Sequence, residues 1–214
     1  AACRHAKKRV QFKQSLGEFE LVKKKIAFMA AHAFAMEATT QQCAAFIDRD
    51  EADYMLETAM LKVWSTDALW KIVNDTLQIY GGKGFFTDEP LERWMRDARL
   101  NMIGEGANDV LRAFIAMVGI KPVADQLLGA KEAWENRSFG KLLGFVGRQI
   151  KGRFAVPNVP VKSYALKSTA KQMGRRVREL RNAVLSMLMK HREDILFRQY
   201  VMERLVDADY ELYA

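Results

Sequence analysis

The chain has 214 residues, half of them hydrophobic, and a net charge of +8 at pH 7. This length accommodates one large or two small domains with a substantial core, and the low proline and glycine content favours a helical protein. No stretch reaches the roughly 18 consecutive apolar residues of a membrane-spanning helix, and the N-terminus lacks the apolar core of a secretory signal. The two cysteines and three histidines show no metal-ligand spacing, so we expect no metal site.

Two long stretches carry apolar and small residues at alternating steps of three and four, the spacing of one face of a bundle helix. They cover residues 19–47 and 56–80. The acidic segment 48–53 supplies the turn between them, with Asp53 as N-cap of the second helix. Because this connection is short, we expect the two helices to lie antiparallel.

Glycine and proline mark the ends of the following elements. Gly81 and Gly82 end the second long helix. Pro90 begins a short helix that we expect to reach Asp97, and residues 98–104 are expected to form an extended connector.

The next helix begins at Asn108 or Asp109. Both residue types cap helix N-termini. We expect this helix to run through Val118, because Gly119 and Pro122 then stop it.

Beyond that proline the sequence becomes more basic. Residues 139–154 carry an apolar helical stripe, and residues 156–160 contain two prolines and are expected to form a linker. Residues 166–191 show a third seam of alternating steps, and residues 197–212 form the last predicted helix.

The positive charge is confined to the C-terminal part. Residues 1–120 hold 16 Lys or Arg and 16 Asp or Glu, whereas residues 121–214 hold 18 and 10. This asymmetry indicates two functional units. We therefore predict an all-α fold, with an antiparallel helical bundle domain at residues 1–122 and a smaller basic helical domain at residues 123–214.

A lone acid, Glu105, stands between Gly104 and Gly106 just ahead of the helix that begins at Asn108. Flanking glycines let backbone and ligand approach closely. From the residues alone the carboxylate could be a general base, a helix cap or a solvated loop side chain. The glycines at 81, 82 and 84 could likewise present N–H groups to a phosphate or simply form a C-cap and turn.

Four ordered motifs resemble the C-terminal helical domain of the acyl-CoA dehydrogenase flavoenzymes, over residues 1–120. They are Arg9-Val10-Gln11-Phe12, Gln78-Ile79-Tyr80-Gly81-Gly82, Arg96-Asp97-Ala98-Arg99 and Ile103-Gly104-Glu105-Gly106-Ala107-Asn108-Asp109. The resemblance implies that Glu105 is the catalytic base and that Gly104 and Gly106 lie at the acyl-CoA substrate. It also implies FAD contacts, several of them across a dimer interface, for Arg9, Gln11, Phe12, Gln78, Gly81, Gly82, Ala107, Asn108 and Asp109.

The implied activity is FAD-dependent α,β-dehydrogenation of a long-chain acyl-CoA to the trans-2-enoyl-CoA. The family passes electrons to electron-transfer flavoprotein, forms homodimers or dimers of dimers, and works in the bacterial cytoplasm or the mitochondrial matrix. Its N-terminal helical and central β-domains supply much of the site, so we expect residues 1–214 alone to be inactive. Two positions depart from the family: Lys13 replaces a usual Gly, and Ala107 replaces Thr or Ser.

The C-terminal part resembles the helical extension of the very-long-chain branch in architecture and charge. That branch associates with membranes, which implies a peripheral membrane contact through residues 139–154. The glycines of this segment equally allow close packing inside a bundle. A non-enzymatic relative that binds DNA or membranes through the basic helices remains the alternative, although no base-reading motif accompanies the cations, so we do not expect nucleic acid as a partner.

Overall fold

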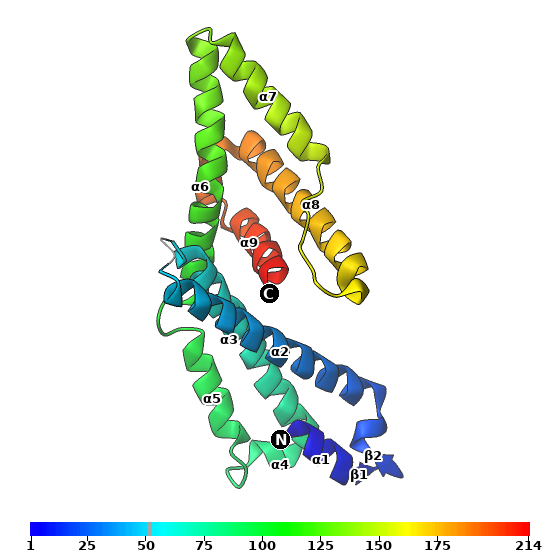
Figure 1. Ribbon diagram of the computed structural model, residues 1–214. Helices are drawn as coiled ribbons and strands as arrows, with labels where there is room; N and C mark the ends of the chain where they lie inside the picture. Colours follow the sequence, from blue (N-terminus) through cyan, green and yellow to red (C-terminus); the bar gives the residue numbers. More distant parts are fainter. Residues whose placement is uncertain (51–52) are drawn as a thin grey trace. The chain divides into compact units, whose positions relative to one another are not determined.

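The computed structural model describes residues 1–50 and 53–214 (Figure 1). It confirms the all-α prediction. The chain forms two compact units, unit 1 from Ala1–Leu111 together with Ala214, and unit 2 from Arg112–Tyr213. The predicted domain boundary between residues 122 and 123 falls in the same helix, α6 (Asn108–Glu135), about three turns after this division. It stays a prediction about which residues form each functional part.

In unit 1 the long helix α3 (Met55–Tyr80) is the central element. It packs against α1 (Ala2–Lys8), α2 (Glu20–Asp48), α4 (Gly82–Phe85) and α5 (Leu91–Asn101). This position explains why α3 buries residues on several sides, with Val63 fully inaccessible. Both predicted long helices are confirmed, and Figure 1 shows α2 and α3 running in opposite directions.

Between α2 and α3 the predicted N-cap, Asp53, is wrong by one position. The Oδ1 atom of Asp53 accepts a hydrogen bond of 3.2 Å from the N–H of Met55, although Tyr54 occupies the N-cap position. Residues 51 and 52 of the predicted turn lie outside the described residues. In α2 the buried residues are Thr39 and Cys43, one turn apart, whereas Thr40 is exposed.

A short hairpin follows α1, and a 3-10 turn at Leu16–Glu18 joins it to α2. Strands β1 (Val10–Gln11) and β2 (Gln14–Ser15) pair antiparallel. The two residues between them, Phe12 and Lys13, have φ values of 51° and 68°. Consecutive left-handed residues are the signature of a two-residue type I′ hairpin turn. Sequence analysis missed it because two-residue strands are too short to show alternation.

The glycines after α3 behave as predicted. Helix α3 ends at Tyr80, and Gly81 takes φ 62° and ψ −145°, a conformation that L side chains rarely adopt. A further glycine, Gly84, lies so close to Tyr80 and Leu77 that a Cβ would meet both. The turn after α3 therefore needs glycine at 81 for its backbone conformation and glycine at 84 because a side chain would not fit.

The predicted extended connector at residues 98–104 is wrong. Helix α5 continues to Asn101, and the carbonyl of Leu100 then accepts the N–H groups of Ile103 (2.9 Å) and Gly104 (2.8 Å). Residues 98–101 contain no helix breaker, so the helix runs on until the chain must turn. The Glu105 loop therefore follows directly after the end of α5.

The predicted stop of α6 is also wrong, because the helix passes through Pro122 to Glu135. An internal proline costs about 3 kcal/mol and one hydrogen bond. Ile120 before it and Ala133 after it are both buried, so the helix packs on either side of the proline. Among the described helices α6 alone is long and apolar enough, by length and composition, to cross a membrane.

Unit 2 contains the rest of α6, followed by α7 (Phe139–Phe154), α8 (Lys167–His191) and α9 (Gln199–Tyr213). Two 3-10 segments, Tyr164–Leu166 and Arg192–Phe197, flank α8. The predicted stripe at residues 139–154 is confirmed as a helix, and residues 156–160 are non-helical as predicted.

Helix α9 is fixed to α6 by a polar cluster. The Nε atom of Arg112 lies 3.0 Å from Oδ1 of Asp207, which also accepts a 2.6 Å hydrogen bond from the hydroxyl of Tyr210. Desolvation, followed by the hydrogen bond to Asp207, raises the pKa of Tyr210 above its ordinary value. The buried face of α9 thus carries Tyr210, one turn beyond Val206.

Candidate functional site

The backbone of the Glu105 loop is held in an unusual conformation. Glu105 has φ 55° and Gly106 has φ 94°. A left-handed backbone conformation costs an L-residue roughly 1–2 kcal/mol, so the conformation of Glu105 is one that glutamate adopts unfavourably. At Gly106 a Cβ would also lie 3.2 Å from the side chain of Leu111. Glycine is therefore required at 106 by both conformation and space.

The residue that anchors this loop is Asn108. Its side chain is only 4% exposed. Its Nδ2 donates to Oδ1 of Asp67 (2.8 Å) and to Oγ1 of Thr66 (2.9 Å), both on α3. Its backbone N–H bonds to the carbonyl of Met102 at 3.0 Å. The start of α6 is thus tied to α3 from one side and to the end of α5 from the other.

A second anchor is Lys62, which sequence analysis did not single out. Its Nζ donates to the carbonyl oxygen of Gly106 at 2.6 Å and to Oδ1 of Asn108 at 2.8 Å. Burial lowers the pKa of Lys62 by desolvation, against the opposing charges of Asp67 and Glu105. The sequence offered only a weak indication of this anchor. Lys62, Thr66 and Asp67 are polar residues beside the apolar seam of the second long helix.

These contacts hold Gly106 and Asn108, and Glu105 between Gly104 and Gly106 is itself exposed. A hydrogen bond from a charged donor is worth about 1.5–3 kcal/mol, comparable with the cost of left-handed backbone at Glu105. The loop can therefore hold its strained shape. A carboxylate presented in this way is available to accept a proton from a ligand.

The structure gathers all the loop residues predicted for substrate and flavin at this one place. Gly104 and Ala107 are half-buried, and Asp109 is exposed. Asn108 turns its side chain inward to α3. The contacts predicted for the loop, of Ala107, Asn108 and Asp109 with FAD and of Gly104 and Gly106 with the substrate, stay predictions.

The residues predicted for the FAD diphosphate lie at the other end of α3. Gln78, Gly81 and Gly82 are exposed, and nothing lies within 4 Å of a Cβ built at either glycine. The backbone here is bare, so a phosphate group could approach it without meeting a side chain.

Helix α1 brings the first motif to the same end of unit 1. The ring of His5 stacks on Tyr80 at 4.0 Å, and burial, followed by the charges of Lys83 and Arg9, lowers the pKa of His5. Beyond α1, Arg9 and Gln11 are exposed and the ring of Phe12 is 87% exposed. The cation, the amide and the aromatic ring of this motif are thus exposed to solvent.

The two groups of residues do not meet within one chain. Lys62 and Gln78 mark the two regions on α3, and 16 residues of helix separate them by about 24 Å. This separation fits the predicted arrangement in which one region serves the flavin of a neighbouring subunit. The part of the chain that the structure describes contains no cluster of three or more His, Cys, Asp or Glu.

Comparison with known families decides the relationship. The family model described as the C-terminal domain of acyl-CoA dehydrogenase matches residues 1–120. The chain belongs to the acyl-CoA dehydrogenase family. The match covers every motif named in the sequence analysis, from Arg9 to Asp109.

Individual relatives agree with this family. The mitochondrial very long-chain specific acyl-CoA dehydrogenase of Bos taurus is 32% identical over 216 residues, which cover 98% of this chain and 33% of that protein. The chain therefore spans about a third of the length of the curated relatives it matches, and the match includes the basic C-terminal part.

Solved structures support the fold. An acyl-CoA dehydrogenase from Bacillus anthracis, complexed with FAD, matches 99% of this chain and 37% of its own, with 22% identity and a TM-score of 0.75. A chain in the structure described as electron transferring flavoprotein of Acidaminococcus fermentans matches 52% of this chain and 29% of its own. It has 33% identity and a TM-score of 0.50.

Proposed function

We propose that the intact protein containing this chain dehydrogenates long-chain acyl-CoA to the trans-2-enoyl-CoA, with Glu105 as the catalytic base. The observation that carries this proposal is the exposed Glu105, with left-handed backbone, in a loop that Lys62 and Asn108 hold to α3 by hydrogen bonds. A fixed base is what the chemistry needs, because the α-hydrogen of a thioester is a very weak acid.

In this mechanism a carboxylate oxygen of Glu105 accepts the proton from the α-carbon. We assign Gly104 and Gly106 to the thioester as its neighbours in the loop, and Lys62 and Asn108 hold the loop through their hydrogen bonds. Bound FAD supplies the two-electron acceptor for the hydride that leaves the β-carbon. Ala107, in place of the family's hydroxyl residue, removes one hydrogen-bonding group from this region.

The residues of this chain fit FAD. The bare backbone at Gly81 and Gly82 suits a diphosphate, and the exposed Arg9 and Phe12 suit a phosphate and an aromatic ring. Gln11, Gln78, Asn108 and Asp109 complete the proposed cofactor contacts. Because the regions lie about 24 Å apart along α3, we propose that they serve two flavins in a homodimer or dimer of dimers.

The remaining expectations follow from the family. We propose electron-transfer flavoprotein as the electron acceptor, which the match to the Acidaminococcus fermentans structure supports. Matches to mitochondrial and bacterial proteins support the mitochondrial matrix or the bacterial cytoplasm as the location. Residues 1–214 alone are expected to bind FAD poorly and to be inactive.

Anaerobic bleaching of the flavin absorbance on adding palmitoyl-CoA tests this function in the intact protein. The unaltered protein should bleach, and Glu105→Gln should slow bleaching by about 100-fold or more. Glu37→Gln, an exposed glutamate on α2, is the matched control and should bleach normally. Normal bleaching by Glu105→Gln, or none by the unaltered protein at any chain length, would refute the proposal.

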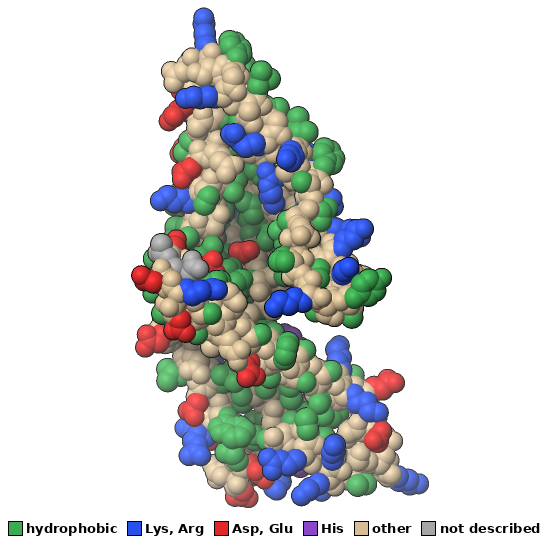
Figure 2. Space-filling model, in the orientation of Figure 1, with side chains coloured by type: hydrophobic (Ala, Val, Ile, Leu, Met, Phe, Trp, Pro, Cys, Tyr) green, Lys and Arg blue, Asp and Glu red, His purple; other side chains and the backbone are tan. Residues whose placement is uncertain are grey.

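We also propose that α7 makes a peripheral membrane contact. No residue of α7 is buried, and Phe139, Leu143, Ile150 and Phe154 are each more than half exposed. Figure 2 shows Lys and Arg side chains interspersed with hydrophobic ones over the α7 part of unit 2. The cations of this helix are Lys141, Arg148, Lys151 and Arg153. An exposed apolar stripe flanked by cations is typical of a helix that lies on an anionic membrane surface.

Co-sedimentation of the intact protein with vesicles tests this contact. We expect binding to phosphatidylcholine vesicles that contain phosphatidylglycerol, weaker binding to pure phosphatidylcholine, and a loss with Leu143→Ser. Equal binding by Leu143→Ser would contradict a role for α7. Salt-sensitive binding to duplex DNA without vesicle binding would favour the nucleic-acid alternative.

A further inference from the structure

The Glu105 loop rests on a lysine that lies 44 positions before Gly106 in the sequence. Nζ of Lys62 bonds to a backbone carbonyl of the loop (2.6 Å) and to the side chain of Asn108 (2.8 Å). The first contact falls on Gly106, the residue directly after the proposed base. A side chain that fixes this carbonyl also fixes the rotation of the adjoining peptide groups, because φ and ψ are the only soft backbone torsions.

Asn108 and Lys62 hold different parts of the loop. Asn108 is bonded to Thr66 and Asp67 as well as to Lys62, so the start of α6 stays attached to α3 without the lysine. The Gly106 carbonyl, in contrast, receives its described hydrogen bond from Lys62. Removing the ammonium should therefore free the Gly106 peptide while α6 remains in place.

The ammonium is also in an environment that favours a fixed position. Desolvation lowers its pKa while Asp67 on α3 and Glu105 in the loop oppose this change. A partly buried cation that already makes two charge-assisted hydrogen bonds has little freedom to move away. The Glu105 loop is thus supported by a group that is itself constrained.

We propose that Lys62 is a positioning residue for proton abstraction, which holds the Gly106 carbonyl and so keeps the Glu105 carboxylate in its productive place. This inference rests on the proposed function of Glu105. Lys62 touches neither substrate nor cofactor in this role, and it acts through the loop backbone. Its loss should lower the rate of the chemical step and leave substrate affinity unchanged, because a misplaced base weakens the transition state alone.

The test uses Lys62→Met in the intact protein, with Lys62→Arg as the conservative variant and Lys71→Met as the matched control. Lys71 lies on the same helix and pairs with Asp75 at 3.3 Å, away from the loop. We expect Lys62→Met to reduce the rate of anaerobic flavin reduction by palmitoyl-CoA about 10-fold at saturation, with the Kd changed less than twofold. Lys62→Arg should recover part of the rate, and Lys71→Met should retain all of it.

A double-mutant cycle separates positioning from a general structural defect. If Lys62 acts through the base, Lys62→Met should have no further effect on the residual rate in a Glu105→Gln background. An equal 10-fold loss in that background would overturn the inference, as would an unchanged rate in Lys62→Met alone.

A second measurement is independent of turnover. In the intact protein, hydrogen–deuterium exchange of the Glu105, Gly106 and Ala107 amides should be faster in Lys62→Met, as expected of increased mobility, with the amides of α3 unchanged. Equal mobility in both proteins would overturn the inference whatever the activity. Absence of flavin reduction in the unaltered protein would refute the proposed function instead, and the two failures are thereby distinguished.

Discussion

Units 1 and 2 are both helical, yet they use polar side chains in different ways. Among the described residues unit 1 buries Thr39, Asp75, Thr76 and Asn108, whereas unit 2 buries the hydrogen-bonded Tyr210 of its polar cluster. In unit 2 no residue of α7 is buried, and this helix exposes a continuous apolar stripe. Buried hydrogen-bonded groups fix one geometry, whereas an exposed apolar face requires a partner surface. We propose on this basis that unit 1 positions a site and that α7 of unit 2 meets another surface.

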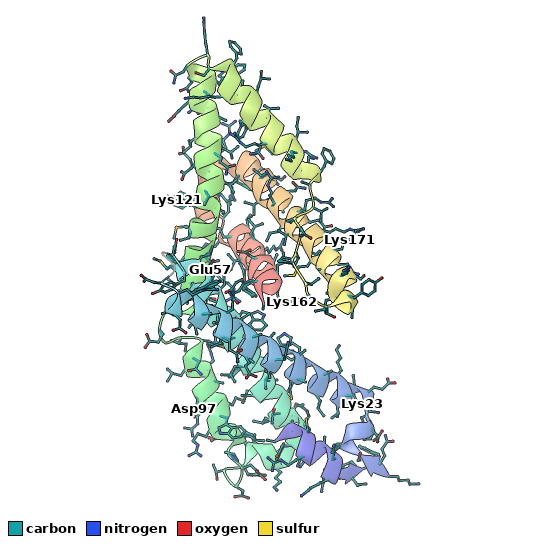
Figure 3. All side chains as sticks on the ribbon, viewed as in Figure 1. Lys23, Glu57, Asp97, Lys121, Lys162 and Lys171 are labelled. Atoms are coloured by element: carbon teal, nitrogen blue, oxygen red, sulfur yellow. The ribbon has the colours of Figure 1, made fainter. Side chains whose placement is uncertain are left out.

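A large electrostatic effect on stability is expected at Asp75, whose side chain is almost fully buried between Lys25 and Lys71. Asp75→Asn should lower the free energy of unfolding by about 2 kcal/mol at pH 7, because both ammonium groups lose a charged partner. Chemical denaturation measures this. Asp97→Asn, an exposed aspartate on α5 (Figure 3), is the control and should change stability by less than about 0.5 kcal/mol.

The same carboxylate should make stability depend on acid pH. Desolvation would raise the pKa of Asp75, but the hydrogen bonds and charges of Lys25 and Lys71 together lower it below the ordinary value. The stabilisation is therefore present at neutral pH and is lost as pH falls below about 4 towards the folded-state pKa. In Asp75→Asn the free energy of unfolding should depend less on pH in this acid range. An unaltered dependence in the variant would show that other carboxylates cause it.

A second expected effect concerns Gly106, where backbone and space both demand glycine. Gly106→Ala should lower the free energy of unfolding by about 2 kcal/mol, from the φ of 94° and the contact with Leu111. The counterpart in unit 2 is Gly119, inside α6 with nothing near a Cβ, where alanine should stabilise by about 0.5–1 kcal/mol. If Gly106→Ala and Gly119→Ala changed the free energy of unfolding equally, the Gly106 loop of unit 1 would not be more constrained than α6 of unit 2.

A smaller effect of opposite sign is expected at Lys13. This residue has φ 68° at the position where the family usually has glycine, so the hairpin turn carries strain here. Lys13→Gly should raise the free energy of unfolding by about 0.5–1 kcal/mol. Lys13→Ala removes the charge and keeps the strain, so a gain in both variants would assign the effect to charge.

The smallest effect on stability is expected in α7. Leu143→Ser should change the free energy of unfolding by less than about 0.5 kcal/mol, because Leu143 is 72% exposed. Leu91→Ala in unit 1, where the leucine is 1% exposed, should cost about 3 kcal/mol. A cost above 1 kcal/mol at Leu143 would mean that α7 buries its stripe within the protein and does not present it to a membrane.

The sequence predicted elements whose signals are local. The seams of α2 and α3, the glycine end at Gly81 and the helix at Phe139–Phe154 follow from side-chain periodicity and backbone preference. It failed where tertiary packing overrides such preferences, as at Pro122 in the middle of α6. Lys62 was missed for a related reason, since a hydrogen bond to a residue 44 positions away leaves no local pattern.

The central claim is that Glu105 removes the α-hydrogen, and isotope exchange tests it most directly. In the intact protein under anaerobic conditions in D₂O, palmitoyl-CoA should gain deuterium at its α-carbon, and Glu105→Gln should lose this exchange while still binding the acyl-CoA. Exchange at the unaltered rate in Glu105→Gln would contradict the account and move the base to another residue.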